Sequence, residues 1–189
     1  MIDQVFDFIQ KLLSQYLKNA FALDQDKIVI NNVIDPDGSI PMENNNKIVL
    51  SLLNLEQETS QPFVQRNKKL ADGNYTSIQP DLRFNIDILF TANFDNYNES
   101  LKFLNAVLLF FQANPLISNT NYSNVPSGIN KLEFDVEKLD YHQMHNLWSA
   151  MGAKYQPSVI YKLRLISMNA EQTLGFDPAI INTQNTITP

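Results

Sequence analysis

The stretch that decides the fold is LRFNIDILFTANFDNYNESLKFLNAVLLFFQA, residues 82–113. In its first part, apolar and polar residues alternate over Leu82–Phe94, which is the period of a strand with one packed face. In its second part, apolar residues recur every three or four positions, which predicts a helix through Ser100–Ala113. Asn114-Pro115 then ends that helix. This segment therefore supplies a strand and the helix that follows it.

The flanking sequence contains more elements of both kinds. Apolar residues at helical spacing predict a first helix that Asp3 caps and that reaches Leu17. A short helix, Tyr141–Met151, follows Asp140 as its cap and ends at Gly152. β-Branched or alternating runs predict strands at Lys27–Val33, Lys47–Glu56, Lys131–Lys138 and Pro157–Met168.

This order of elements favours an α+β fold: a single domain with a largely antiparallel sheet and helices packed on one face. A chain of 189 residues suits one such domain, which we place at residues 1–168. Residues 169–189 are polar and Thr-rich, and we expect them to form a polar C-terminal arm. Thr59–Gln79 is also polar, without a sustained period. We interpret it as a long excursion, without regular structure, between two paired strands.

The composition favours assembly with other proteins. Hydrophobic residues make up 44% of the chain and charged residues 18%, so much of its polarity comes from Asn, Gln and Ser. Uncharged polar surface tolerates burial against protein better than surface rich in Lys and Glu. The net charge is −6, and the densest basic run is Arg66, Lys68 and Lys69. We therefore expect no nucleic-acid partner.

No features of membrane insertion or secretion are present in the sequence. It has no run of about eighteen apolar residues that could span a bilayer. The N-terminus lacks the basic start, apolar middle and small-residue cleavage site of a signal peptide. We expect a protein made in the cytoplasm without a signal peptide and without direct membrane insertion.

The sequence offers little for cofactor or metal chemistry. Cysteine is absent, and the five glycines form no phosphate-binding loop, so we expect no cofactor. His142 and His145 share a face of the short helix, but a third ligand at standard spacing is missing. We interpret them as exposed helix residues and predict no metal site.

Four carboxylates cluster in sequence around the central strand: Asp81, Asp87, Asp95 and Glu99. Helix capping and solvation explain each of them, so we predict no catalytic residues and no enzyme activity. An acid/base pair remains an open alternative. In that case the protein would be a small carboxylate-dependent hydrolase using Asp81 or Asp87.

Six short segments stand out together, at residues 89–92, 98–101, 113–116, 147–151, 155–158 and 161–163. The more specific block among them is a Leu-Trp-x-Ala-Met helix followed by Tyr-x-Pro-Ser-x-x-Tyr. Together these segments resemble the tube-and-sheath terminator, or cap, family of phage-tail-like extracellular contractile injection systems. The resemblance covers nearly the whole chain as far as Met168.

The resemblance implies a phage tail-terminator-like fold and a homohexameric ring that caps one end of the particle. Its implied partners are other copies of itself, the inner tube protein and the sheath protein, in a particle that can be released from the cell. The family motif is carried by Trp148, Tyr155, Pro157, Ser158 and Tyr161, as packing or as interface residues. A stand-alone protein-binding adaptor domain is the other reading of the same features.

Overall fold

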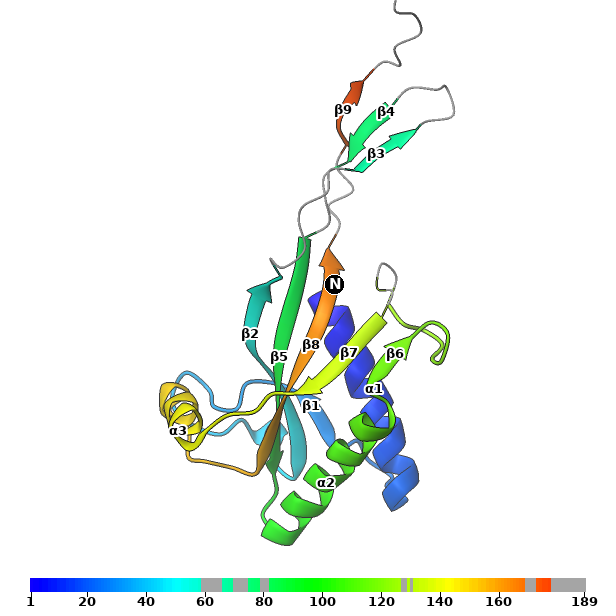
Figure 1. Ribbon diagram of the computed structural model, residues 1–189. Coiled ribbons are helices and arrows are strands. Elements are labelled where there is room, and N and C mark those ends of the chain that lie inside the picture. Colours follow the sequence, from blue (N-terminus) through cyan, green and yellow to red (C-terminus); the bar gives the residue numbers. More distant parts are fainter. Residues whose placement is uncertain are drawn as a thin grey trace, which may run out of the picture.

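The computed structural model describes residues 1–58, 66–69, 75–78, 82–126, 129, 131–168 and 173–177 (Figure 1). The elements are α1 (Ile2–Phe21), β1 (Ile28–Ile30), the 3-10 helix η1 (Met42–Asn44), β2 (Lys47–Gln57), β3 (Arg66–Lys69), β4 (Tyr75–Ile78), β5 (Leu82–Asn93), α2 (Tyr97–Ala113), β6 (Leu116–Ser118), β7 (Lys131–Val136), α3 (Tyr141–Ala150), β8 (Ser158–Met168) and β9 (Thr173–Asp177). Six of the strands form the main sheet, in the order β1-β2-β5-β8-β7-β6. Among these neighbours, only the β1–β2 pair is parallel.

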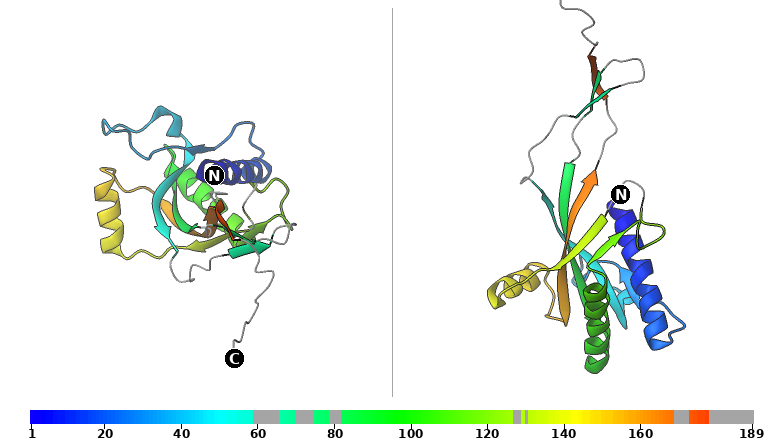
Figure 2. Two further views of the ribbon diagram at one scale, coloured as in Figure 1. Left: turned by 90° about the horizontal axis from the view of Figure 1, so that it is seen from above. Right: turned by 45° about the vertical axis from the view of Figure 1, so that its right-hand side comes forward.

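The two long helices cover one face of the main sheet, here called the helix face (Figure 2). Ile86, Ile88 and Phe90 of β5 point toward these helices and are fully buried, as the alternation in the sequence predicts. The Phe111 ring of α2 lies at the centre of an aromatic cluster. Its centroid is 5.4 Å from that of Phe90 and 4.6 Å from that of Tyr161. A dry aromatic core thus fixes α2 against β5 and β8.

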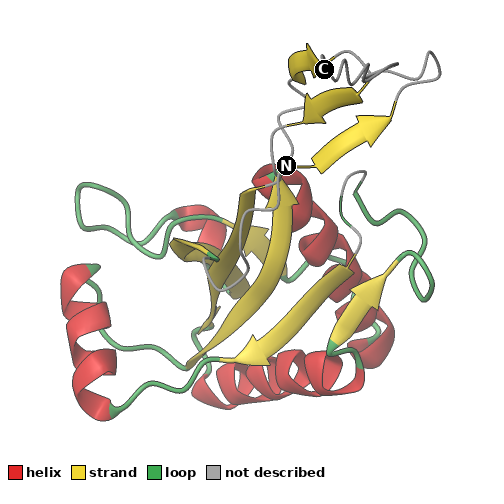
Figure 3. Ribbon diagram, turned by 45° about the horizontal axis from the view of Figure 1, so that its top comes forward, coloured by secondary structure: helices red, strands yellow, loops and turns green. Residues whose placement is uncertain are grey.

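The third helix packs on the opposite face of the sheet, here called the outer face (Figure 3). Trp148 of α3 lies in a small cluster with Leu89 of β5, Ile160 of β8 and Val33 of the segment after β1. The predicted α+β class is confirmed, with this one difference from the expectation of helices on a single face. The period of a short helix identifies its apolar side, but it does not say which face of a sheet that side meets.

The polar excursion between β2 and β5 contains regular structure. β2 and β5 pair antiparallel, so the predicted pairing of the flanking strands is confirmed. However, β3 and β4 lie within Thr59–Gln79 and form a second sheet with β9, so the expectation of no regular structure there is wrong. Figure 1 shows this sheet beyond the ends of β5 and β8. The ladder is made by backbone groups, and the polar sequence gave no period that could reveal it.

Side-chain caps begin two of the helices. Asp140 and Gln143 form the capping box of α3. The backbone N–H of Gln143 donates to Asp140 Oδ1 at 2.7 Å, and the backbone N–H of Asp140 donates to the side-chain Oε1 of Gln143 at 2.9 Å. Asn96 caps α2 by accepting from a first-turn amide. The predicted cap of α1 is wrong, because Asp3 lies inside the first turn and Met1 occupies the cap position.

Candidate assembly surfaces

A groove lies between α3 and the adjoining ends of β7 and β8, with a volume of about 410 Å³; we call it the α3 groove. Three of the five predicted motif residues line it: Trp148, Tyr155 and Ser158. Trp148 is buried, whereas Tyr155 is 59% exposed and meets the Trp148 ring edge-on at 5.6 Å. The groove therefore has a fixed aromatic floor and one aromatic side chain open to solvent.

The other two motif residues lie outside this groove. Tyr161 points to the helix face, where its ring contacts Phe90 and Phe111, and burial raises the pKa of its hydroxyl to about 12. The carbonyl of Pro157 accepts a hydrogen bond from the Ala92 amide at 2.9 Å. The motif thus spans both faces of β8 and joins it to β5. Its role as an interface remains a prediction.

Charged side chains on the outer face are organised around one lysine. The Lys162 ammonium lies 3.3 Å from Glu56 Oε2, 3.8 Å from Asp87 Oδ1 and 3.9 Å from Glu137 Oε2. Burial raises the pKa of the Asp87 carboxyl, although the Lys162 charge opposes that rise. Burial disfavours the charge of Lys162, but the attraction of the three carboxylates outweighs it and raises the lysine pKa. Asp87 therefore belongs to an ion-pair network across β2, β5 and β8.

The remaining candidate catalytic and metal-binding residues form no common site in the structure. Asp95 accepts a hydrogen bond from the Asn46 side chain at 2.9 Å, and Glu99 lies in the first turn of α2. Asp81 lies outside the described residues. His142 and His145 are exposed on α3. Within the ranges that the structure describes, no group of three or more His, Asp or Glu residues is placed to hold a metal ion.

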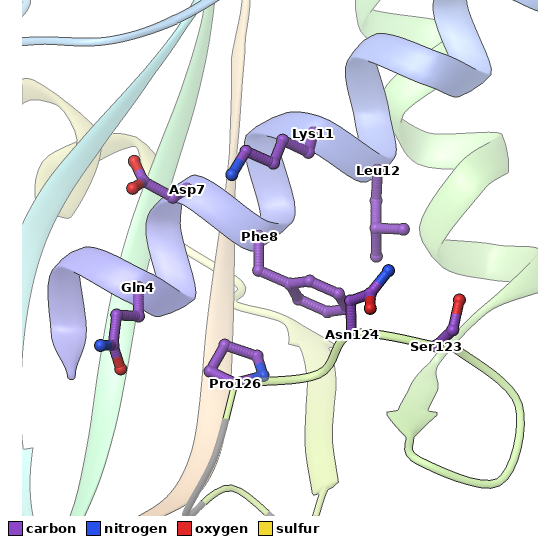
Figure 4. Close-up of a pocket in the computed structure, with 8 residues that line it drawn as sticks. All are labelled: Gln4, Asp7, Phe8, Lys11, Leu12, Ser123, Asn124 and Pro126. Carbon is purple, nitrogen blue, oxygen red and sulfur yellow. The ribbon is translucent and has the colours of Figure 1, made fainter.

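A second pocket, of about 520 Å³, lies between α1 and the segment that precedes β7 (Figure 4). Phe8 points from α1 toward Asn124 and Pro126, and it is buried. Asp7 and Lys11 lie at its rim. Among the described residues, its lining includes one hydroxyl, that of Ser123, and no histidine.

α1 has the length of a membrane-spanning helix but not the character of one. Its 20 residues would nearly cross a bilayer, yet charged residues, Asp3, Asp7, Lys11 and Lys18, recur along it. None of the helices in the part of the chain that the structure describes is both long and apolar enough to span a membrane.

Two exposed apolar patches were missed by the analysis of the sequence. On α2, Tyr97, Leu101 and Leu108 are 63%, 45% and 36% exposed. On β2, Leu52 and Leu55 are 48% and 40% exposed. A signal for the first patch was available, because Glu99 and Lys102 are the only charged residues in the 17 residues of α2. A helix that is apolar on several sides is normally covered on several sides.

The fold and these surfaces define a class: an α+β domain whose candidate sites are docking surfaces. The sequence then places the chain more closely. Residues 4–181 match the family model described as the Pvc16 N-terminal domain, and the chain belongs to that family. The sequence has no significant match among curated proteins.

Two solved structures share the fold. One is the sheath/tube terminator of an extracellular contractile injection system, PVC, in its extended state, with a TM-score of 0.69 and 14% identity. The match covers 100% of this chain and 64% of that one. The other is the tube-terminating cap of the anti-feeding prophage, with a TM-score of 0.58 and 13% identity over 93% of this chain and 59% of that one. The chain thus spans about three-fifths of the length of these proteins.

Proposed function

We propose that the protein is a structural, non-catalytic cap that closes the tube and sheath at one end of a contractile injection particle, as a ring of six identical copies. The observation that carries the proposal is the fold match along the entire chain to a sheath/tube terminator. Its partners are then further copies of itself, the inner tube protein and the sheath protein. The particle acts outside the cell, and the cap itself does not enter a membrane.

A cap of this kind needs unlike contact surfaces, and the chain has them. Copies related by rotation in a ring meet head to tail, so each copy must present one surface to the preceding copy and a different one to the next. The main sheet ends in β1 on one side and in β6 on the other, and both strands are only three residues long. The two sides of the molecule therefore differ, as a closed ring requires.

The charged residues also favour a structural role. Asp87, the candidate acid of a hydrolase, is held beside Lys162, which Glu56 and Glu137 also contact. A general acid or base must be able to reach a substrate proton, and this carboxylate faces a lysine within an ion-pair network. The network links β2, β5 and β8 on the outer face of the sheet, and we assign it no reaction.

The remaining surfaces are available for the last layer of tube and sheath. The α3 groove, with Trp148, Tyr155 and Ser158, offers an aromatic docking site of the kind enriched in protein interfaces. We keep residues 1–168 as the domain and residues 169–189 as an arm that contacts the neighbouring layer. Pairing of β4 with β9 ties that arm to the excursion between β2 and β5, so both act as one projecting contact element.

The proposal is tested by removing the gene from a strain that assembles the particles and measuring particle length by electron microscopy. Without a cap, a growing tube has no surface that ends addition, so we expect particles of uneven length with open ends. Supplying the wild-type gene on a plasmid should restore uniform, closed particles. Uniform closed particles in the deletion strain would contradict the proposal. Purified chain bound as a single copy to one partner would support the adaptor alternative.

A further inference from the structure

Three of the four exposed large apolar side chains of α2 form a stripe on the side turned away from α1. The residues of α2 that face α1 are identified by their contacts: the Phe110 ring lies 5.2 Å from that of Tyr16, and the Lys102 ammonium lies 4.6 Å from the centre of the Phe21 ring. With about 100° of rotation per residue, Leu108 lies roughly half a turn from Phe110. Leu101 and Tyr97 continue the same line. We call Tyr97, Leu101 and Leu108 the α2 stripe.

An apolar corner lies at the opposite edge of the main sheet. β1 pairs with β2 only as far as Leu50, and among the described residues no strand follows on that side up to Gln57. Leu52 and Leu55 are paired with the buried residues Ile88 and Ile86 of β5, so they point to the helix face. There the layer of helices stops, and both leucines remain half exposed.

A groove of about 420 Å³ runs along this corner, between the first two turns of α1 and the exposed part of β2. Ile2 and Phe6 of α1 and Leu52 of β2 supply apolar walls, and Asp3 and Asp7 lie at the rim. We call it the β2-edge groove. A helix docked there would continue the helix layer past α1.

We propose that the α2 stripe of one copy docks in the β2-edge groove of the next copy, and that this contact closes the ring. The inference rests on the proposed function, because it needs copies that meet head to tail. The stripe and the groove lie toward opposite edges of one sheet. The stripe is a helix face and the groove is a hollow, so a contact between them joins two different surfaces and is head to tail.

Charge and polarity favour a second copy as the occupant. The stripe carries no charged residue, so its burial desolvates no ion. Asn105 and Gln112, exposed beside the stripe, are amides that can donate hydrogen bonds to the carboxylates of Asp3 and Asp7 at the groove rim. The docked α2 would cover Leu52 and Leu55 as α1 and α2 cover the rest of the helix face.

The test places a charge in the stripe. We expect Leu101→Glu/Leu108→Glu to lower the apparent affinity between copies by at least about tenfold, because interface centres tolerate charge poorly. The matched control is Leu109→Glu: Leu109 is 48% exposed but lies about 100° further round α2. Light scattering of the purified chain and copy number at particle ends give the readout. Equal loss in both variants, or in neither, would overturn the inference.

A mixing experiment separates this contact from a symmetric one. Leu52→Glu damages only the groove, and Leu101→Glu/Leu108→Glu damages only the stripe. Each variant alone should stay monomeric, whereas an equimolar mixture should form dimers through the one intact stripe and groove. If Leu52→Glu has no effect on association while the stripe variant does, the stripe meets something else and the inference fails.

Cross-linking in assembled particles covers the case in which rings form only on a tube end. The chain contains no cysteine, so Leu52→Cys/Leu108→Cys carries the only two thiols. A flexible bis-maleimide should give a ladder of up to six linked copies, and each single variant should give none. Absence of the ladder from particles that carry the ring would overturn the interface while leaving the cap in place. Absence of the chain from particle ends would instead overturn the proposed function.

Discussion

The two faces of the main sheet are covered by different means, and the difference separates what holds the fold from what is available for contact. On the helix face, α1 and α2 bury a continuous apolar cluster in which Phe111 touches the rings of Phe90, Phe134 and Tyr161. On the outer face, α3 covers one small cluster around Trp148, and the face also carries the ion-pair network of Lys162.

Hydrophobic burial dominates stability, whereas partly exposed ion pairs contribute little. The helix face should therefore carry most of the free energy of unfolding. The outer face can carry contacts and charges without endangering the fold. Substitutions on the two faces measure this difference as changes in the free energy of unfolding.

The largest effect is expected for Phe111→Ala. Removing this ring leaves a cavity among three other aromatic rings, so we expect a loss of about 4 kcal/mol in the free energy of unfolding. Urea denaturation followed by fluorescence measures it. Leu109→Ala, on the exposed side of the same helix, should stay within about 0.5 kcal/mol of wild type. A loss below about 1 kcal/mol for Phe111→Ala would break the comparison.

Trp148→Ala tests the smaller cluster on the outer face. The side chain is 4% exposed, so its removal should cost about 3 kcal/mol, at the lower end for a buried aromatic residue. Tyr155→Ala removes its half-exposed neighbour and should cost less than about 1 kcal/mol. Thermal unfolding followed by circular dichroism gives both values. A larger loss for Trp148→Ala than for Phe111→Ala would reverse the assignment of the two faces.

Asp140→Ala removes the capping box that begins α3. The loss of a side-chain cap usually costs about 1 kcal/mol, and we expect that value from urea denaturation. Asp3→Ala is the control, because Asp3 is an acid in the first turn of α1 and makes no cap hydrogen bond, whereas Asp140 occupies the cap position of α3. Equal losses in the two variants would show that the cap adds nothing beyond the charge.

Asp87→Asn is expected to have the smallest effect and to depend on pH. Burial raises the pKa of Asp87 above 3.8, so the folded state binds this proton more tightly than the unfolded state does. The stability from this group is therefore present below pH 3.8 and is lost as the pH rises through the folded-state pKa. At pH 7 the Asn variant should be more stable, by less than about 1 kcal/mol, and at pH 3 the two should agree. A less stable variant at pH 7 would show that attraction to Lys162 outweighs burial.

Five of the six strands of the main sheet were predictable because period and burial agree in them, whereas the short strand β6 was not predicted. The alternation around Ile86, Ile88 and Phe90 and the helical spacing of Phe103, Val107 and Phe111 each describe a side chain that the structure buries. Helix ends were less certain. Asp140 has Gln143 three residues later, which identifies a capping box, whereas Asp3 follows too closely on the start of α1 to cap it.

Features that depend on contacts between segments far apart in the chain could not be predicted from the sequence. The sequence around Trp148 does not indicate which face of the sheet α3 packs on, because the face depends on the order of β7 and β8 in the sheet. The pairing of β4 with β9 joins segments about a hundred residues apart through backbone groups. The five motif residues lie on α3, on β8 and on the segment between them. However, Tyr161 and Trp148 turned out to lie on opposite faces of the sheet.

The most direct test of the account is a reconstruction of the ends of intact particles by cryo-electron microscopy, without imposed symmetry. The account predicts one end closed by six copies of this fold, side by side, in contact with the final layer of tube and sheath. A particle end that lacks the chain, or that carries it as a single copy, would contradict the account.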